Sequence, residues 1–253
     1  MPEIIIGGRR ISCSLLIFDL DNTLIDAEER FRALADARMR VISRRFGGEV
    51  ASHWARFSGV DPALGYVDMD GPLAKAPRRE DIVVAAVALY LTGMGWGEAR
   101  RLAEEAYEEA DRIMASEYMA KPLPGIPETL ERLRDAGFTL AVATNEVRHR
   151  ALRILEEAGL LHLIEVVVGA DEVENPKPAP DIILLACRRC GLPPSDAIYI
   201  GDQPEDLTAA ERAGVWAIGV GSTLRGRAEI YVDSIADLEP FNPIGERLKA
   251  AKS

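Results

Sequence analysis

After Pro122 the chain alternates strictly between short apolar runs and helical segments. Each helical segment stops at or just before a glycine, the residue that most easily adopts the backbone conformation closing a helix. Helices are expected over residues 127–135, 148–158, 180–189 and 205–213. Strands are expected over residues 139–143, 165–168, 197–200 and 216–220. Single helices between consecutive strands predict a parallel sheet with right-handed crossovers.

A further apolar run, LLIFDL at residues 15–20, predicts a buried strand with a carboxylate near its end. One strand cannot bury both faces alone, so it must belong to the same sheet. Between this strand and the rest lie expected helices at residues 27–46, 81–91 and 97–119, and a Gly-, Pro- and Asp-rich loop at 58–80. The pattern therefore predicts a Rossmann-like α/β core, residues 1–25 and 122–253, with an all-helical domain inserted at residues 26–121.

Composition and charge narrow the range of partners. The chain has 253 residues, of which 48% are hydrophobic and 28% charged, an ordinary globular balance. Its formal net charge of −11 argues against nucleic acid or an anionic membrane as a general partner. The N-terminus lacks the pattern of a secretory signal, and the apolar part of residues 82–97 is too short to span a bilayer. A cytoplasmic location is expected.

Three cysteines do not suggest a disulfide framework. Cys187 and Cys190 form a C-x-x-C on an expected helix, without a second pair to complete a zinc site. We interpret them as ordinary helix residues; a redox or metal role is the alternative.

Polar residues gather where the expected strands end. In an open parallel sheet, ligands bind at the carboxyl ends of the strands. Turn formation explains each of these positions alone, but not their convergence on one edge. The candidate site residues are Asp19, Asp21, Thr144, Asn145, Lys177, Asp202 and Asp206.

These residue types suit phosphoryl transfer. A phosphate monoester repels a carboxylate nucleophile, and a Mg²⁺ ion held by Asp19 and Asp202 would cancel that repulsion. Asp19 would then attack phosphorus and form an aspartyl-phosphate. Asp21, two residues along an extended backbone, faces the same side and can serve as general acid and then base.

The remaining candidates would stabilise the transferring group. Thr144 offers a hydroxyl to the phosphoryl oxygens, Asn145 is a second expected phosphate-binding residue, and Lys177 offers a fixed positive charge. Asp206 can hold the water shell of the metal or orient Lys177. Gly201 permits a close approach of the backbone.

Four sequence motifs resemble those of the haloacid dehalogenase superfamily: FDLDNTLID at 18–26, ATN at 143–145, NPKPAPDI at 175–182 and IGDQPED at 200–206. They occur in the order of that family and at the corresponding strand ends, over residues 15–26 and about 122–220. The resemblance implies a Mg²⁺ cofactor, with the metal bound by Asp19, the backbone carbonyl of Asp21, and Asp202, and Asp206 nearby. It also implies a strand order of 5-4-1-2-3 and a helical cap of the phosphoglycolate-phosphatase type.

Three differences separate this chain from other branches of that superfamily. The dehalogenases lack an acid at the position of Asp21. The β-phosphoglucomutases usually carry Glu-Asp where this chain has Gly201-Asp202. The phosphonatases need a cap lysine, and Lys75 and Lys121 have no clear support for that role.

Specificity is expected to come from the cap. Arg78 and Arg79 could bind a substrate carboxylate, or could simply flank and solubilise the next helix. His53, Trp54 and Phe57 could line a pocket, with core packing of the two aromatics as the favoured interpretation.

Three interpretations stay open. The first is a Mg²⁺-dependent phosphatase for small phosphorylated metabolites, with phosphoglycolate as one candidate, acting as a monomer or homodimer. The second is a phosphomutase of the same fold. The third is a non-catalytic binding module, against which the intact Asp19, Asp21, Thr144, Lys177 and Asp202 argue.

Overall fold

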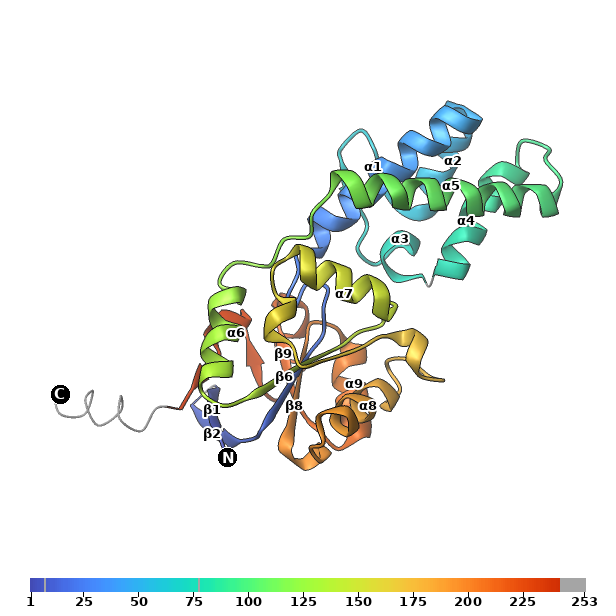
Figure 1. Cartoon of the computed structure of the whole chain (residues 1–253). Coiled ribbons are helices and arrows are strands. Elements are labelled where there is room, and N and C mark those ends of the chain that lie inside the picture. The colour runs from blue at the N-terminus through green and yellow to red at the C-terminus, as the bar shows by residue number, and fades with distance from the viewer. Residues whose placement is uncertain (7, 77, 242–253) are drawn as a thin grey trace. The chain divides into compact units, whose positions relative to one another are not determined.

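The computed structural model describes residues 1–6, 8–76 and 78–241. The chain divides into two compact units, one of Met1–Asp26 with Ala120–Ser253 and one of Ala27–Met119. The first unit is built around a parallel sheet and the second mainly from helices (Figure 1). The assignment of the first unit as a catalytic core and of the second as a cap stays a prediction.

The central sheet has six strands in the order β10-β9-β8-β3-β6-β7, and every neighbouring pair is parallel. The strands are β3 (Leu15–Phe18), β6 (Thr139–Ala143), β7 (Val166–Val168), β8 (Ala197–Gly201), β9 (Trp216–Val220) and β10 (Tyr231–Val232). The order 5-4-1-2-3 expected for five strands is confirmed by β9-β8-β3-β6-β7. The sixth strand, β10, adds an edge that was not predicted.

Strand β3 lies at the centre of this sheet, and all four of its residues are buried. Phe18, its last residue, is level with Val142 of β6 and Ile200 of β8. The ladder continues one step further, because the amide of Asp19 donates to the carbonyl of Ile200 at 2.9 Å. The ends of three neighbouring strands are thus aligned at one edge.

Helices cover both faces of the sheet (Figure 1). They are α6 (Ile126–Asp135), α7 (Arg148–Glu157), α8 (Asp181–Cys190) and α9 (Pro204–Ala213). Helices α8 and α9 pack in one apolar cluster with residues of β3 and β8, including Ile17 and Tyr199. Helices α6 and α7 lie on the opposite face. The chain moves outward from β3 to β6 and β7 and then returns past β3 to β8 and β9, and right-handed crossovers in opposite directions put their helices on opposite faces.

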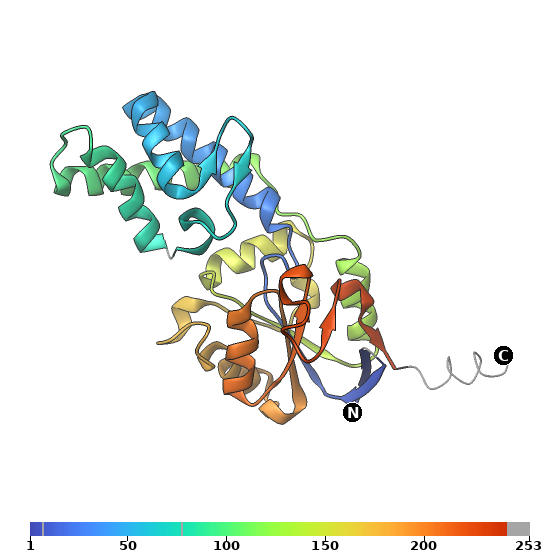
Figure 2. The same cartoon turned by 180° about the vertical axis from the view of Figure 1, so that it is seen from behind.

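A second sheet in this unit was not predicted. Strands β1 (Glu3–Ile6), β2 (Arg9–Ser12) and β11 (Glu239–Pro240) form an antiparallel sheet in the order β11-β1-β2. Figure 2 shows the blue N-terminal strands beside the red strand from the far end of the chain. Its strands are very short, and β1 and β11 come from opposite ends of the chain. Their pairing therefore cannot be predicted from a local sequence pattern.

The second unit contains α1 (Ala27–Phe46), α2 (Gly48–Ser58), α3 (Pro72–Lys75), α4 (Arg78–Tyr90) and α5 (Trp96–Glu117). The expectation of an entirely helical insertion with a loop at 58–80 needs a correction. Strands β4 (Val60–Asp61) and β5 (Tyr66–Val67) form a hairpin there, followed by α3. Strands of two residues are too short to show a period-two alternation. The sequence of this segment therefore predicts a loop.

A buried polar network joins the helices of the second unit. Arg38 of α1 donates to Asp81 of α4 at 2.5 Å, and both side chains are almost fully buried. Tyr107 of α5 donates to the same carboxylate at 2.9 Å and accepts from the indole of Trp54 at 2.8 Å. The Arg38 guanidinium also lies 4.0 Å from the centre of the Tyr107 ring. Three helices therefore share one buried ion pair.

Two other expectations concern the cysteines and the membrane. Burial raises the pKa of the Cys187 and Cys190 thiols to about 11, so both stay protonated near neutral pH, in keeping with ordinary helix residues. Within the described ranges, no helix combines the length and apolar character needed to cross a bilayer.

Candidate active site

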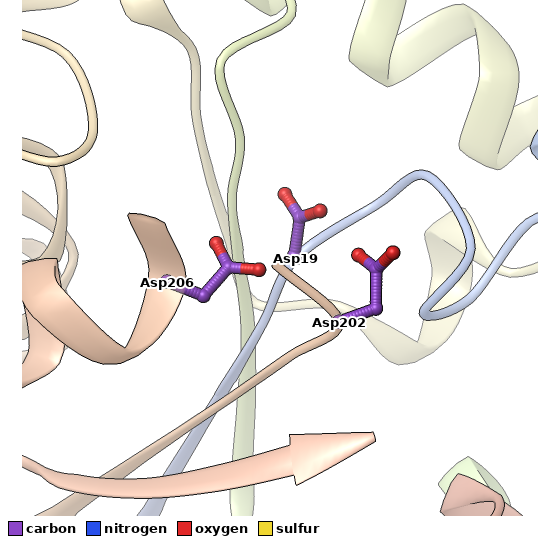
Figure 3. A group of neighbouring side chains, drawn as sticks. All are labelled: Asp19, Asp202 and Asp206. Carbon is purple, nitrogen blue, oxygen red and sulfur yellow. The ribbon is translucent and has the colours of Figure 1, made fainter. Parts of the chain in front are cut away.

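Three buried carboxylates meet at the carboxyl edge of the central sheet. Asp19 follows β3, Asp202 follows β8, and Asp206 lies in the first turn of α9. One oxygen from each lies within 4.8 Å of the others. Figure 3 shows the three carboxylates gathered around one point, although they come from separate segments. The sequence prediction that strand ends would bring these residues together is thus realised for Asp19, Asp202 and Asp206.

Lys177 lies among these carboxylates and is itself buried. Its Nζ donates to Asp19 Oδ1 at 2.6 Å and to Asp206 Oδ1 at 2.6 Å. Burial alone would lower the pKa of the ammonium, but the charges of Asp19 and Asp206 raise that pKa well above its ordinary value. Lys177 is therefore a permanent cation held between two acids.

The site carries more negative than positive charge. Burial raises the pKa of Asp19 to about 7, and the charges of Asp206 and Asp202 add to this, while Lys177 acts in the opposite direction. Burial and the two neighbouring carboxylates together therefore outweigh the stabilisation that Lys177 gives to ionised Asp19. A further cation at this point would stabilise the ionised carboxylates.

Helix α9 and its preceding loop set the position of Asp206. Asp206 Oδ2 accepts from the amide of Gln203 at 2.9 Å, which caps the helix, and Oδ1 faces Lys177. A Cβ atom on Gly201 would lie 2.3 Å from Asp206 Oδ2. The glycine is required for this approach, and Asp206 orients Lys177 directly, which is one of the two roles anticipated for it.

The end of β6 contributes Thr144 and Asn145. Asn145 Oδ1 accepts from the amide of Lys177 at 2.9 Å, and its Nδ2 donates to the carbonyl of the same residue at 3.1 Å. The side chain of Asn145 thus fixes the backbone of Lys177. That Asn145 also contacts phosphate stays a prediction. Thr144 Oγ1 accepts from the amide of Glu146 at 3.1 Å, so its own hydroxyl proton can be directed at a ligand.

Asp21 lies in a tight turn directly after Asp19. The amides of Leu24 and Ile25 both bond to the carbonyl of Leu20, and Asn22 adopts a left-handed conformation at φ 56°. Asparagine tolerates that conformation better than most residues. Asp21 lies within this turn, two residues after the expected nucleophile, and its side chain is half-buried.

Tyr199 belongs to this site but was not singled out in the sequence. Its hydroxyl accepts from Lys177 Nζ at 3.0 Å and donates to the carbonyl of Ala143 at 2.8 Å. Burial and the charge of Asp206 raise its pKa well above the ordinary value, so the hydroxyl stays neutral. The available signal was a single hydroxyl-bearing residue in the buried run AIYIG, since a buried polar group needs a partner.

The residues expected to select the substrate belong to the second unit. Both terminal nitrogens of Arg78 bond to the carboxylate of Asp111, at 3.3 and 2.7 Å, and this use of the guanidinium favours a role in packing. The Arg79 side chain is 83% exposed. Trp54 is fully buried, which confirms core packing, whereas Phe57 is partly exposed and stacks on His53.

The central sheet is parallel and carries a lysine and three buried carboxylates at its carboxyl edge, where open α/β sheets bind their ligands. The family model for haloacid dehalogenase-like hydrolases matches residues 13–214, and the chain belongs to that family.

Its relatives include named phosphatases. It is 32% identical over 206 residues to the "Probable phosphatase IndB" of Dickeya dadantii, covering 81% of this chain and 80% of that protein. It is 27% identical over 239 residues to the phosphoglycolate phosphatase of Salmonella typhi, covering 88% and 90%. The chain is accordingly a phosphatase of the haloacid dehalogenase-like family.

Solved structures share the fold. A β-phosphoglucomutase from Clostridium difficile has a TM-score of 0.60 at 19% identity, with 95% of this chain and 99% of that chain covered. A haloacid dehalogenase-superfamily hydrolase from Geobacter sulfurreducens has a TM-score of 0.58 at 22% identity, with 89% and 94% covered.

Proposed function

We propose that the protein is a Mg²⁺-dependent phosphatase that hydrolyses phosphate monoesters of small metabolites through an aspartyl-phosphate at Asp19. The observation that carries the proposal is the contact between Asp19 Oδ1 and Lys177 Nζ at 2.6 Å, within a cluster of three buried carboxylates. A buried carboxylate beside a fixed cation is suited to attack a group that is itself negatively charged.

The donor set fits Mg²⁺. Carboxylate oxygens are the hard ligands that this ion prefers, and the cluster has an excess of negative charge. Asp19 and Asp202 would hold the ion together with the carbonyl of Asp21, and Asp206 would support it while it holds Lys177. When bound, Mg²⁺ supplies charge neutralisation between the carboxylates and the phosphoryl oxygens.

The residues of the chain then divide the reaction into two steps. In the first, Asp19 forms a bond to phosphorus while the bond to the ester oxygen breaks, and Asp21 gives a proton to the leaving oxygen. In the second, Asp21 takes a proton from water, the water attacks phosphorus, and Asp19 is released together with inorganic phosphate. Thr144 and Lys177 hold the non-bridging oxygens throughout.

Gly201 favours a phosphatase over a phosphomutase. The mutases of this superfamily usually carry a glutamate at that position, next to the metal-binding aspartate. In this chain even a Cβ atom at residue 201 would collide with Asp206. The close approach of Asp206 of α9 therefore leaves no space at position 201 for the glutamate of a mutase.

The substrate class follows from the relatives rather than from the site. Several are named phosphoglycolate phosphatases, so small phosphorylated metabolites, with phosphoglycolate first, are the substrates we propose. The unit Ala27–Met119 would select among them as a cap. A cytoplasmic location and a monomeric or homodimeric state accompany this proposal.

A phosphate-release screen over small phosphorylated metabolites tests the function. We expect release with Mg²⁺, none with EDTA, and recovery when Mg²⁺ is restored, with Ca²⁺ a poor substitute because it loosens octahedral geometry. Parallel reactions with and without a sugar bisphosphate separate a phosphatase from a mutase. Turnover that persists in the chelator, or that appears only with the bisphosphate, would contradict the proposal.

A further inference from the structure

The Lys177 ammonium has three N–H donors, and each has one acceptor in the structure. Two of the acceptors are the carboxylates of Asp19 and Asp206, each at 2.6 Å. The third is the neutral hydroxyl of Tyr199, at 3.0 Å. Each N–H of the ammonium therefore points at its own acceptor. Lys177, Asp206 and Tyr199 are all buried.

The Tyr199 hydroxyl is itself held in place. Its proton has two acceptors within reach, the carbonyl of Ala143 at 2.8 Å and Oδ1 of Asp206 at 3.3 Å, and with either one a lone pair is left for Lys177. Ala143 is the last residue of β6 and directly precedes Thr144. The hydroxyl thus links the lysine from the loop before α8 to the strand that presents Thr144.

The two carboxylates and the hydroxyl act on the ammonium in different ways. Attraction between charges depends on distance and only weakly on the direction of each N–H. Each of the three hydrogen bonds adds a preferred N–H direction, and for the neutral hydroxyl of Tyr199 this direction is most of its effect on the ammonium. With one N–H held by Tyr199 and one by Asp206, the last N–H must point at the edge where Asp19 lies.

We propose that Tyr199 is a positioning residue: its hydroxyl sets the rotation of the Lys177 ammonium so that one N–H faces Asp19 and the phosphoryl oxygens beside it. The expected effect on turnover rests on the proposed phosphatase function; the effect on Lys177 does not. Phenylalanine would fill the same space in β8 and would keep the packing against α8 and α9, so the hydroxyl can be tested alone.

The first experiment compares steady-state kinetics of Tyr199→Phe with the parent. We expect kcat to fall by about tenfold to a hundredfold with KM within about threefold, because misplacement of a group that acts in the transition state lowers kcat. Tyr107→Phe is the matched control. Tyr107 is also fully buried, and its hydroxyl also bonds to a carboxylate, Asp81, but it lies in the second unit. This control should lower the thermal midpoint and leave kcat unchanged.

The second experiment observes Lys177 directly. The chain has five lysines, and both Lys75 and Lys121 are exposed whereas Lys177 is buried. After selective ¹⁵Nζ labelling, a slowly exchanging ammonium signal that Lys177→Met removes identifies this residue. In Tyr199→Phe we expect that signal to shift and to exchange faster with water, and in Tyr107→Phe we expect no change.

An unchanged Lys177 signal in Tyr199→Phe overturns the proposal, whatever happens to kcat, and so does a kcat equal to that of the parent. Absence of turnover in the parent would instead contradict the proposed function, while the ammonium signal still tests Tyr199. If Tyr199→Phe does not fold, 3-fluorotyrosine placed at position 199 keeps the size but weakens the hydroxyl as an acceptor. A lower kcat and a shifted Lys177 signal are then expected, and no change in either contradicts the proposal.

Discussion

At the scale of single residues, the site is organised around Lys177 rather than around any one acid. Asn145 holds its backbone through both amide atoms, and Asp19 and Asp206 hold its ammonium. Charge-assisted hydrogen bonds of this kind are roughly twice as strong as neutral ones. In the proposed reaction, a lysine held at both its backbone and its ammonium would present a charge of fixed position to the phosphoryl group, as electrostatic stabilisation requires.

The residue-scale prediction concerns the nucleophile. Asp19→Asn keeps the shape of the side chain but removes the charge that would attack phosphorus in the proposed mechanism. We expect kcat to fall by at least about a thousandfold, because the covalent route needs that carboxylate. Phosphate release is the measurement, and Glu229→Gln is the control, since Glu229 is an exposed carboxylate of the same unit that pairs with Arg9. Activity of Asp19→Asn within tenfold of the parent would exclude Asp19 as nucleophile.

At the scale of elements, the junction between β8 and α9 decides whether the acids can meet. Gly201 ends β8, and Asp206 of α9 approaches its backbone where any Cβ would lie. In Gly201→Ala we expect Asp206 to be displaced and, with it, the ammonium of Lys177, so that kcat falls by about tenfold or more. Gly97→Ala is the control, because a Cβ there meets nothing within 4 Å. Equal kcat in the two variants would show that Asp206 need not lie so close to β8.

The second element-scale prediction concerns the stability of the helical unit. Asp81→Asn leaves the buried Arg38 guanidinium without its counter-charge, and breaking a buried pair in this way costs about 3–5 kcal/mol. We expect a lower midpoint of urea unfolding for the transition of this unit. Glu117→Gln, which removes the half-exposed partner of Arg40, should leave the midpoint nearly unchanged. Similar midpoints in both variants would mean that the Arg38–Asp81 pair contributes little.

At the scale of the whole molecule, the two chain crossings between the units lie side by side. The amide of Asp26 donates to the carbonyl of Lys121 at 3.0 Å, and Ile25 pairs with Pro122 in an antiparallel bridge. The first unit is thus closed on itself at the point where the second is inserted. Such a junction permits removal of the insertion without opening the central sheet.

We predict that a protein lacking residues 27–119, with the gap bridged, loses discrimination among substrates more than it loses chemistry. An aryl phosphate has a leaving group that needs little protonation, so in the proposed mechanism its hydrolysis would depend mainly on Asp19, Lys177 and Mg²⁺. The measurement is the ratio of kcat/KM for phosphoglycolate to that for the aryl phosphate. A ratio equal to that of the full chain would show that the insertion does not select the substrate. A circular dichroism spectrum verifies folding first.

The same comparison decides the role of the arginines at the start of α4. Because Arg78 is engaged by Asp111, we expect Arg78→Ala to lower stability and to leave the ratio unchanged. A selective rise in KM for phosphoglycolate in Arg78→Ala or Arg79→Ala would restore them as carboxylate-binding residues.

Many elements of this fold can be predicted from short stretches of the sequence. Residues 139–143 and 216–220 were expected as strands and are strands, and residues 27–46 were expected as one helix and form one. Apolar periodicity and glycine stops are properties of neighbouring residues, and they suffice for elements of normal length. The rule that ligands bind at the carboxyl ends of parallel strands also predicted that Asp19, Lys177, Asp202 and Asp206 would lie close together, as they do.

What only the tertiary structure decided depends on contacts between distant segments. The pairing of β1 with β11, the two-residue strands of the β4–β5 hairpin and the Arg38–Asp81 ion pair have no local signature. The same holds for Tyr199, which reads as one more buried strand residue until Lys177 and Ala143 are brought to its hydroxyl. A short sequence pattern records which face of an element is apolar, whereas the partner of a buried polar group is chosen by the packing of the whole unit.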